Sequence, residues 1–167
     1  MGAMTPLGQT PEAFWANLAA GNSGVGPMTL CDPTEYPCRI SGEVSDFDPG
    51  QYIGDKEARR MARFTQLAVA AGLQALECSG LDVSREDPYR VGVILGNGNG
   101  GFPTLEENCR VLVDRGGLRM SPFFFPMVLP NMAAAAVSRY LGAHGYNSTA
   151  TTACAASNQA IGEGLDA

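Results

Sequence analysis

The sequence predicts a layered α/β domain, and three observations support this class. Helical patterns alternate with short apolar runs in the order helix, strand, helix, helix, strand, helix. Of the 167 residues, 45% are hydrophobic and 17% are charged, which is typical of a globular protein with one core. The 21 glycines and 11 prolines indicate frequent turns between the elements. We therefore expect one domain over residues 1–167.

The first half of the chain begins with a clear helix signal. Thr-Pro-Glu at 10–12 places a capping hydroxyl, a proline and an acid where a first helical turn favours them, and the helix should end near Gly21. Residues 22–54 show little periodicity and predict a long surface segment with short strands around 39–44. Over 55–79, apolar residues at three- and four-residue steps predict the longest helix.

The second half repeats the alternation of elements. A β-branched run that includes Val91 and Val93 is typical of a strand buried on both faces, whereas residues 121–130 are aromatic and broken by prolines. The predicted elements are a strand over 90–95, helices over 104–115 and 131–141, a strand over 147–152 and a helix over 155–167.

Charge and cysteine content exclude several classes. The net charge of −6 argues against a general nucleic-acid binder, and no apolar stretch approaches the roughly 20 residues that span a bilayer. The N-terminus shows no signal-peptide pattern, and five widely spaced cysteines do not form a disulfide framework. With a single histidine, His144, and no CxxC motif, a zinc site is disfavoured. We expect a cytoplasmic protein without a bound metal.

Cys154 is the strongest candidate for chemistry. It falls where the predicted strand ends and the last helix begins, and a helix N-terminus offers unpaired N–H groups that stabilise a thiolate or an oxyanion. The alanines around it leave room for a long thioester. The pattern alone also fits a buried structural cysteine in an alanine-rich helix, and this alternative stays open at this point.

Six ordered motifs, which cover essentially the whole chain, resemble the β-ketoacyl-acyl-carrier-protein synthases of the elongating type. They are Gly2–Gly8, Phe14–Trp15 with Ala20–Gly24, Lys56–Met61, Gly96–Gly101 with Glu106–Asn108, Ser121–Phe124 with Pro130–Met132, and Thr152–Ser157 around Cys154. The resemblance implies the N-terminal half of a thiolase-like fold, a layered α/β/α domain with a mixed five-stranded sheet. The first strand is expected to be missing, so we expect a chain that is truncated at both ends.

The resemblance also implies a two-stage reaction. Cys154 takes an acyl group that arrives on the phosphopantetheine of an acyl carrier protein, and a malonyl carrier then loses CO₂ and extends the chain by two carbons. No other cofactor is implied. The family places its catalytic His pair and Lys in the second half, so the fragment alone should be inactive, and His144 is expected to be structural. The implied partners are acyl carrier protein and a second subunit, either identical or homologous.

Further site residues follow from the same resemblance. The glycine loop with Asn99 should line the acyl pocket, and Phe124 is expected to bind substrate as well. A basic group is expected to dock the acidic carrier protein, although such clusters are often only solvated surface. Its members are Lys56, Arg59, Arg60 and Arg119.

Two alternative functions are weighed against this assignment. Gly96-x-Gly98-x-x-Gly101 after a strand fits the dinucleotide fingerprint of an oxidoreductase. Pro103 should interrupt the helix that this fingerprint requires, and no acidic residue ends a following strand, so we disfavour it. The other alternative is a non-catalytic, chain-length-type partner subunit of the same fold. Because such subunits usually lack the nucleophile, Cys154 argues against it.

Overall fold

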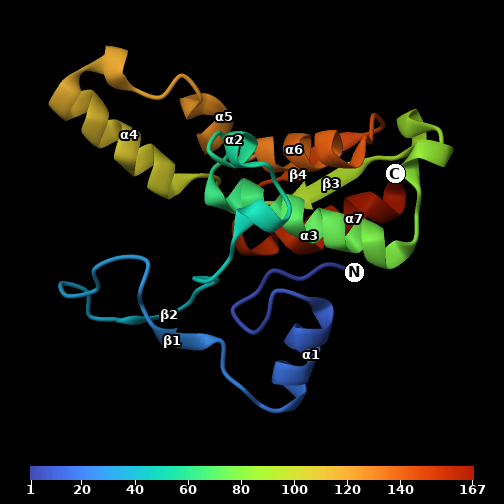
Figure 1. The fold of residues 1–167 in the computed structure, drawn as a ribbon, viewed down its shortest axis with the longest axis horizontal. Coiled ribbons are helices and arrows are strands. Elements are labelled where there is room, and N and C mark those ends of the chain that lie inside the picture. The colour runs from blue at the N-terminus through green and yellow to red at the C-terminus, as the bar shows by residue number, and fades with distance from the viewer.

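A computed structural model describes all residues, 1–167, and its centre is a parallel two-stranded sheet between helices (Figure 1). Strands β3 (Val93–Gly96) and β4 (Asn147–Ala150) pair in register from Val93↔Asn147 to Gly96↔Ala150. Helices α3 (Arg63–Ser79) and α6 (Met132–Leu141) lie together on one side, and α7 (Ala156–Asp166) lies on the other. The α/β class predicted from the sequence is therefore observed.

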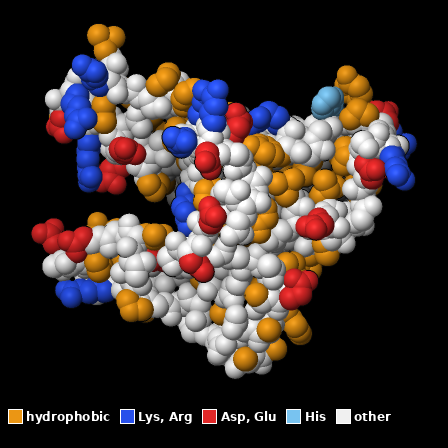
Figure 2. Space-filling model, viewed as in Figure 1, with side chains coloured by type: hydrophobic (Ala, Val, Ile, Leu, Met, Phe, Trp, Pro, Cys, Tyr) orange, Lys and Arg blue, Asp and Glu red, His pale blue; other side chains and the backbone are white.

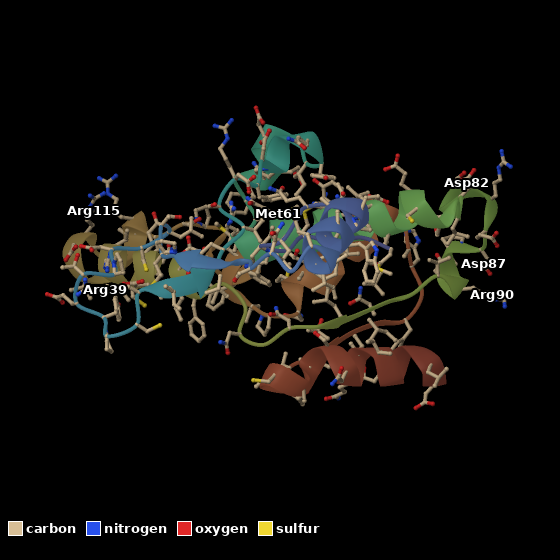
Figure 3. The ribbon with its side chains drawn as sticks, turned by 90° about the horizontal axis from the view of Figure 1, so that it is seen from below. Arg39, Met61, Asp82, Asp87, Arg90 and Arg115 are labelled. Atoms are coloured by element: carbon tan, nitrogen blue, oxygen red, sulfur yellow. The ribbon has the colours of Figure 1, made fainter.

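Two neighbouring residues of β4 show how the strand separates its covering helices. The Asn147 side-chain amide donates to the carbonyl oxygen of Ala134 in α6 at 3.2 Å. The Ser148 hydroxyl donates to Glu163 in α7 at 3.0 Å. Because successive strand residues point to opposite faces, α6 and α7 cover opposite faces of the sheet. Figure 3, seen from below, shows α7 as a separate layer.

The predicted helix over 55–79 is wrong in one respect, because the chain forms two helices there. Helix α2 (Asp55–Ala58) stops, and α3 begins after Ala62, whose backbone is extended at φ −70° and ψ 160°. The Gln66 side chain donates to the carbonyls of Ala58 and Met61 at 2.8 and 3.2 Å, which satisfies acceptors that the break exposes. The bend buries Met61, which Figure 3 labels, in the core.

Two regions extend from this centre (Figure 1). On the N-terminal side lie α1 (Pro11–Ala19), which the Thr10 hydroxyl caps as predicted, and the antiparallel pair β1 (Val25–Pro27) and β2 (Ile40–Gly42). On the other side α4 (Phe102–Arg115) and α5 (Phe124–Val128) project together. Short 3₁₀ turns span Pro49–Gln51, Val83–Arg85, Pro88–Arg90, Gly117–Arg119 and Ala153–Ala155.

The observed sheets are smaller than expected. Instead of a mixed five-stranded sheet, the structure has two separate two-stranded sheets, β1–β2 and β3–β4. Strand β3 starts at Val93 because the 3₁₀ turn Pro88–Arg90 occupies the beginning of the predicted strand. Strand β4 ends at Ala150, before the residues that turn toward Cys154.

The core is confined to the central layers. Only 19 residues are buried, and the main cluster joins α3, α6 and the strands through side chains such as Val69, Val93 and Val137. Large apolar side chains remain exposed elsewhere, and many of them lie on the projecting elements and on α7 (Figure 2); they include Trp15, Val113, Leu118, Ile161 and Leu165. None of the helices has the length and apolar character needed to cross a membrane.

Candidate active site at the junction of β4 and α7

Cys154 lies in the tight turn that joins β4 to α7. The strand ends at Ala150, a 3₁₀ turn occupies Ala153–Ala155, and α7 starts at the next residue. The thiol is exposed. The N–H of Ala155 donates to Thr152, whereas no acceptor in the chain meets the N–H of Cys154 itself. The turn therefore presents a thiol and a free donor at one residue.

The residue before the cysteine has an unusual backbone conformation. Ala153 is the only non-glycine residue with a positive φ, at 51°. For an L-residue with a Cβ this conformation costs about 1–2 kcal/mol, so the surrounding structure must hold it. Such a strained strand–turn–helix corner is a known way to lift a nucleophile out of a sheet edge. No local pattern predicts this conformation, because alanine is not a residue that favours this region.

The corner is held against the end of β3. A Cβ added to Gly96 would lie 2.4 Å from the carbonyl carbon and oxygen of Ala156, so α7 begins in direct backbone contact with β3. The N–H of Asn97 donates to the carbonyl of Ala150 at 2.9 Å. The glycine loop and the Cys154 turn thus share the carboxyl edge of the two strands, where open α/β sheets bind ligands.

The second part of the glycine loop packs closely against the protein's own backbone. Cβ atoms at Gly100 and Gly101 would lie 2.4 and 2.2 Å from the carbonyl oxygens of Val128 and Met127. The Asn97 amide also donates to the carbonyl of Pro130 at 2.9 Å. Gly100 and Gly101 therefore allow the loop and the end of α5 to meet, whereas Gly98 faces open space.

One argument from the sequence against a dinucleotide site is wrong, although its conclusion stands. Pro103 does not interrupt the helix after the loop, because α4 starts at Phe102 and the proline occupies its first turn, where a missing N–H is tolerated. The lack of an acidic residue in the following strand, which ends at Ala150, is the argument that stands against this alternative.

The two predicted substrate-binding residues lie on the two segments that meet there. Asn99 is exposed in the loop between β3 and α4. Phe124 is half-buried at the start of α5, edge-to-face with Phe125 at 5.2 Å between ring centroids. Hydrogen bonds from Gly101 to Val128 and from Asn97 to Pro130 join these two segments, but Asn99 and Phe124 take no part in them.

The predicted docking residues are all exposed cations without an acidic partner. Glu57, which lies between Lys56 and Arg59 in the sequence, is paired with Arg139 at 2.5 Å. The guanidinium of Arg60 lies 4.6 Å from the centroid of the Phe123 ring. This contact brings the bend between α2 and α3 against the segment that follows the 3₁₀ turn Gly117–Arg119. None of the four forms an ion pair; they are Lys56, Arg59, Arg60 and Arg119.

His144 lies at the other end of the strands. It precedes β4, its N–H donates to the carbonyl of Pro88 at 2.8 Å, and its ring stacks edge-on against Tyr89 at 5.6 Å. Cys154 follows the carboxyl end of the same strand. This placement agrees with a structural role for the histidine.

The carboxyls with shifted pKa values are in the projecting N-terminal region. Hydrogen bonds from Thr34 lower the pKa of Asp32, and a bond from the Thr29 hydroxyl is the main cause that lowers the pKa of Glu43. Both carboxylates are engaged locally, so neither is a candidate acid or base for Cys154.

Solved structures place this arrangement among the ketosynthases. The chain is similar to "The ishigamide ketosynthase/chain length factor", with a TM-score of 0.88, 30% identity, and coverage of 99% of this chain and 41% of that one. A β-ketoacyl synthase from Burkholderia phymatum gives a TM-score of 0.81 at 26% identity, over 99% of this chain and 41% of that one. The fold and site therefore define the N-terminal part of a ketosynthase.

The family follows from the sequence match. Residues 1–167 match the family described as beta-ketoacyl synthase, N-terminal domain, and the chain belongs to it. It is 42% identical over 163 residues to 3-oxoacyl-[acyl-carrier-protein] synthase 2 of Synechocystis, which covers 98% of this chain and 39% of the relative. The Staphylococcus aureus protein of the same description is 41% identical, with 98% and 40% covered. The chain thus spans about two-fifths of these relatives.

Proposed function

We propose that this chain is the acyl-accepting part of a β-ketoacyl-acyl-carrier-protein synthase, with Cys154 as the nucleophile. The observation that carries the proposal is the turn itself: an exposed thiol, preceded by a residue at φ 51°, with its own N–H free. These groups serve the first stage of the reaction; by resemblance, a second oxyanion donor comes from the family's second half.

In this first stage the thiolate of Cys154 attacks the carbonyl carbon of an acyl group bound to phosphopantetheine. The free N–H of Cys154 donates to the oxyanion that develops, as preorganised donors do in acyl transfer. The intermediate collapses, the carbon–sulfur bond to phosphopantetheine breaks, and phosphopantetheine leaves as a thiolate that takes a proton from water. The acyl group is then a thioester on Cys154, and the carrier is released.

The second stage needs groups that these residues do not contain. Loss of CO₂ from a malonyl carrier leaves a carbanion that attacks the acyl group and expels the Cys154 thiolate. By resemblance, the family stabilises that carbanion with two histidines and a lysine from its second half. This chain has one histidine, His144, at the wrong end of the sheet. We therefore propose that the 167 residues supply the nucleophile but do not elongate an acyl chain on their own.

The carrier is proposed to dock on the basic group defined by Lys56, Arg59, Arg60 and Arg119. These side chains are exposed and unpaired, as a surface for an acidic partner requires. A similar solved structure, with a TM-score of 0.82 and 26% identity, is described as a type II polyketide synthase acyl-carrier protein in complex with its ketosynthase. Its coverage is 99% of this chain and 44% of that one.

A second subunit is the other proposed partner. The ishigamide structure pairs a ketosynthase with a chain length factor. We propose that the protein containing this chain likewise forms a dimer with an identical or homologous subunit. A non-catalytic subunit remains the alternative function, and the fate of Cys154 separates the two.

The experiment is to incubate the full-length protein that contains this chain with a mass-labelled acyl-carrier thioester and to locate the acyl group by peptide mapping. We expect the label on Cys154, its loss in Cys154→Ala, and its retention in the matched variant Cys109→Ala, because both thiols are exposed. Equal acylation of the wild-type chain and Cys154→Ala would contradict the proposal and favour the non-catalytic subunit.

A further inference from the structure

Four polar side chains form a continuous hydrogen-bonded row beside the Cys154 turn. The Thr152 hydroxyl bonds to the Gln159 carbonyl oxygen at 2.8 Å, and the Gln159 amide bonds to Glu163 at 2.8 Å. The other oxygen of Glu163 accepts from the Ser148 hydroxyl at 3.0 Å. The row therefore starts in β4, crosses α7 and returns to the turn.

The direction of this row is fixed by its chemistry. An ionised carboxylate only accepts hydrogen bonds, so the Gln159 side chain must present its NH₂ to Glu163. Its carbonyl oxygen then faces Thr152, and the threonine hydroxyl must donate. Gln159 and Glu163 are one helical turn apart, so α7 holds both on one face. A single arrangement of donors results, and it ends at Thr152.

Thr152 is the residue at which the backbone leaves the sheet. Its φ and ψ are −98° and 41°, and Ala153 follows at φ 51°. Between the end of β4 and the start of α7, the Thr152 hydroxyl makes the one side-chain hydrogen bond. Nothing else in these side chains ties the strained corner to α7.

We infer that Gln159 and Glu163 are positioning residues for Cys154, acting through the hydroxyl of Thr152. They hold the corner in the conformation that exposes the thiol and its free N–H. They do not touch the acyl group themselves. This inference rests on the proposed function, because it assigns a means of orienting the same nucleophile.

A merely structural row makes a different prediction. If these bonds only attach α7 to β4, their loss lowers the melting temperature and leaves the reactivity of Cys154 in the folded chain unchanged. If they position the corner, the reactivity of Cys154 falls while the other four thiols are unaffected. Those thiols are exposed and serve as references within the same molecule: Cys31, Cys38, Cys78 and Cys109.

The experiment measures the alkylation rate of each cysteine by iodoacetamide in the folded chain, with the melting temperature in parallel. Thr152→Val removes the hydroxyl of Thr152 and keeps the shape of its side chain, whereas Thr152→Ser keeps the hydroxyl. Gln159→Met removes the side-chain amide and keeps a similar side-chain length. We expect Cys154 to react about fivefold more slowly in Thr152→Val and Gln159→Met, the effect of one lost hydrogen bond. Thr152→Ser should react like the wild type.

The outcomes separate this inference from the proposed function. An unchanged Cys154 rate in folded Thr152→Val or Gln159→Met, with Cys154 fastest in the wild type, overturns the positioning role alone. A Thr152→Ser variant as slow as Thr152→Val also overturns it. A wild-type chain in which Cys154 is no faster than the other thiols overturns the proposed function and this inference together.

Discussion

At Gly96 the end of β3 touches the first turn of α7 with no side chain between them. Because Cys154 lies directly before α7, the close approach of α7 to β3 also determines where the Cys154 turn lies relative to the sheet. The nearest backbone atoms to a Cβ at this position would be those of Ala156 and Ser157, at 2.4–2.5 Å. Since these are backbone atoms, the clash cannot be relieved by a rotamer change.

Gly96→Ala should therefore destabilise the chain, because α7 must move away from β3 to admit one methyl group. We expect a loss of about 2–3 kcal/mol in the free energy of unfolding, measured by urea titration, as for other overpacked sites. Gly98→Ala is the matched control, since no atom lies within 4 Å of its Cβ, and it should change stability by less than about 1 kcal/mol. Equal effects of the two substitutions would contradict this account of the corner.

Residue-scale features divide into those that the sequence could predict and those that it could not. Thr10 as a helix cap and the end of that helix near Gly21 follow from local chemistry, and both are confirmed. The positive φ of Ala153 depends on how α7 is docked, and so does the contact of Gly96. Neither could be predicted from neighbours in the sequence, because each arises from segments that meet only in the fold.

At the scale of elements, the break between α2 and α3 arranges the exposed cations. Lys56 and Arg59 lie at α2, while Arg60 turns onto the ring of Phe123. In a continuous helix, positions 56, 59 and 60 would also share one face. The bend adds the contact of Arg60 with Phe123, which follows the turn that contains Arg119.

Charge reversal of two of these cations should slow the association of acyl carrier protein. For Lys56→Glu/Arg59→Glu we expect about a tenfold lower association rate at low salt, with a difference that shrinks at high salt, because steering between exposed charges is screened. Stopped-flow measurement of carrier binding would test this.

The control carries the same change in charge at the other end of the molecule. Arg85 and Arg90 lie near the amino end of the strands, and Figure 3 labels Arg90 at the end opposite Arg115. Arg85→Glu/Arg90→Glu should have a much smaller effect on the association rate. If both double variants slow association equally, net charge and not the proposed surface controls the encounter.

Most helices could be predicted from the sequence, but their limits could not. Helices α1, α6 and α7 were predicted to within a few residues, because proline, glycine and the periodicity of apolar residues mark them. The break before Arg63 was missed, since the apolar period continues through it and only the capping by Gln66 reveals it.

At the scale of the whole molecule, the buried core is small for the length of the chain. The central layers are well packed, yet α7 exposes Ile161 and Leu165 by 73% and 87%, and the projecting α4 exposes Val113 by 84%. A pocket lies between the two projecting regions (Figure 2). Its lining includes residues of both regions and of α3, among them Leu30, Phe64 and Pro103. Apolar surface on this scale is typical of surfaces that meet other protein.

The sheet was the least predictable part of the fold. The resemblance implied five strands, whereas the structure forms two pairs, because a strand is defined by its partner and not by its own residues. The candidate site was predicted better: Cys154 follows β4 and precedes α7, as its flanking sequence indicates. The row from Thr152 to Ser148 was not predicted, since it joins residues on two elements.

The central claim is that the fold, and not the local sequence, makes Cys154 the nucleophile. The most direct measurement is competitive alkylation of all five cysteines by limiting iodoacetamide, in the native chain and in concentrated urea. All five thiols are exposed in the native structure, so access does not separate them. We expect Cys154 to be labelled several-fold faster than the others in the native chain, and at the same rate in urea. Preferential native labelling of Cys31 or Cys109, or a preference for Cys154 that persists in urea, would contradict the account.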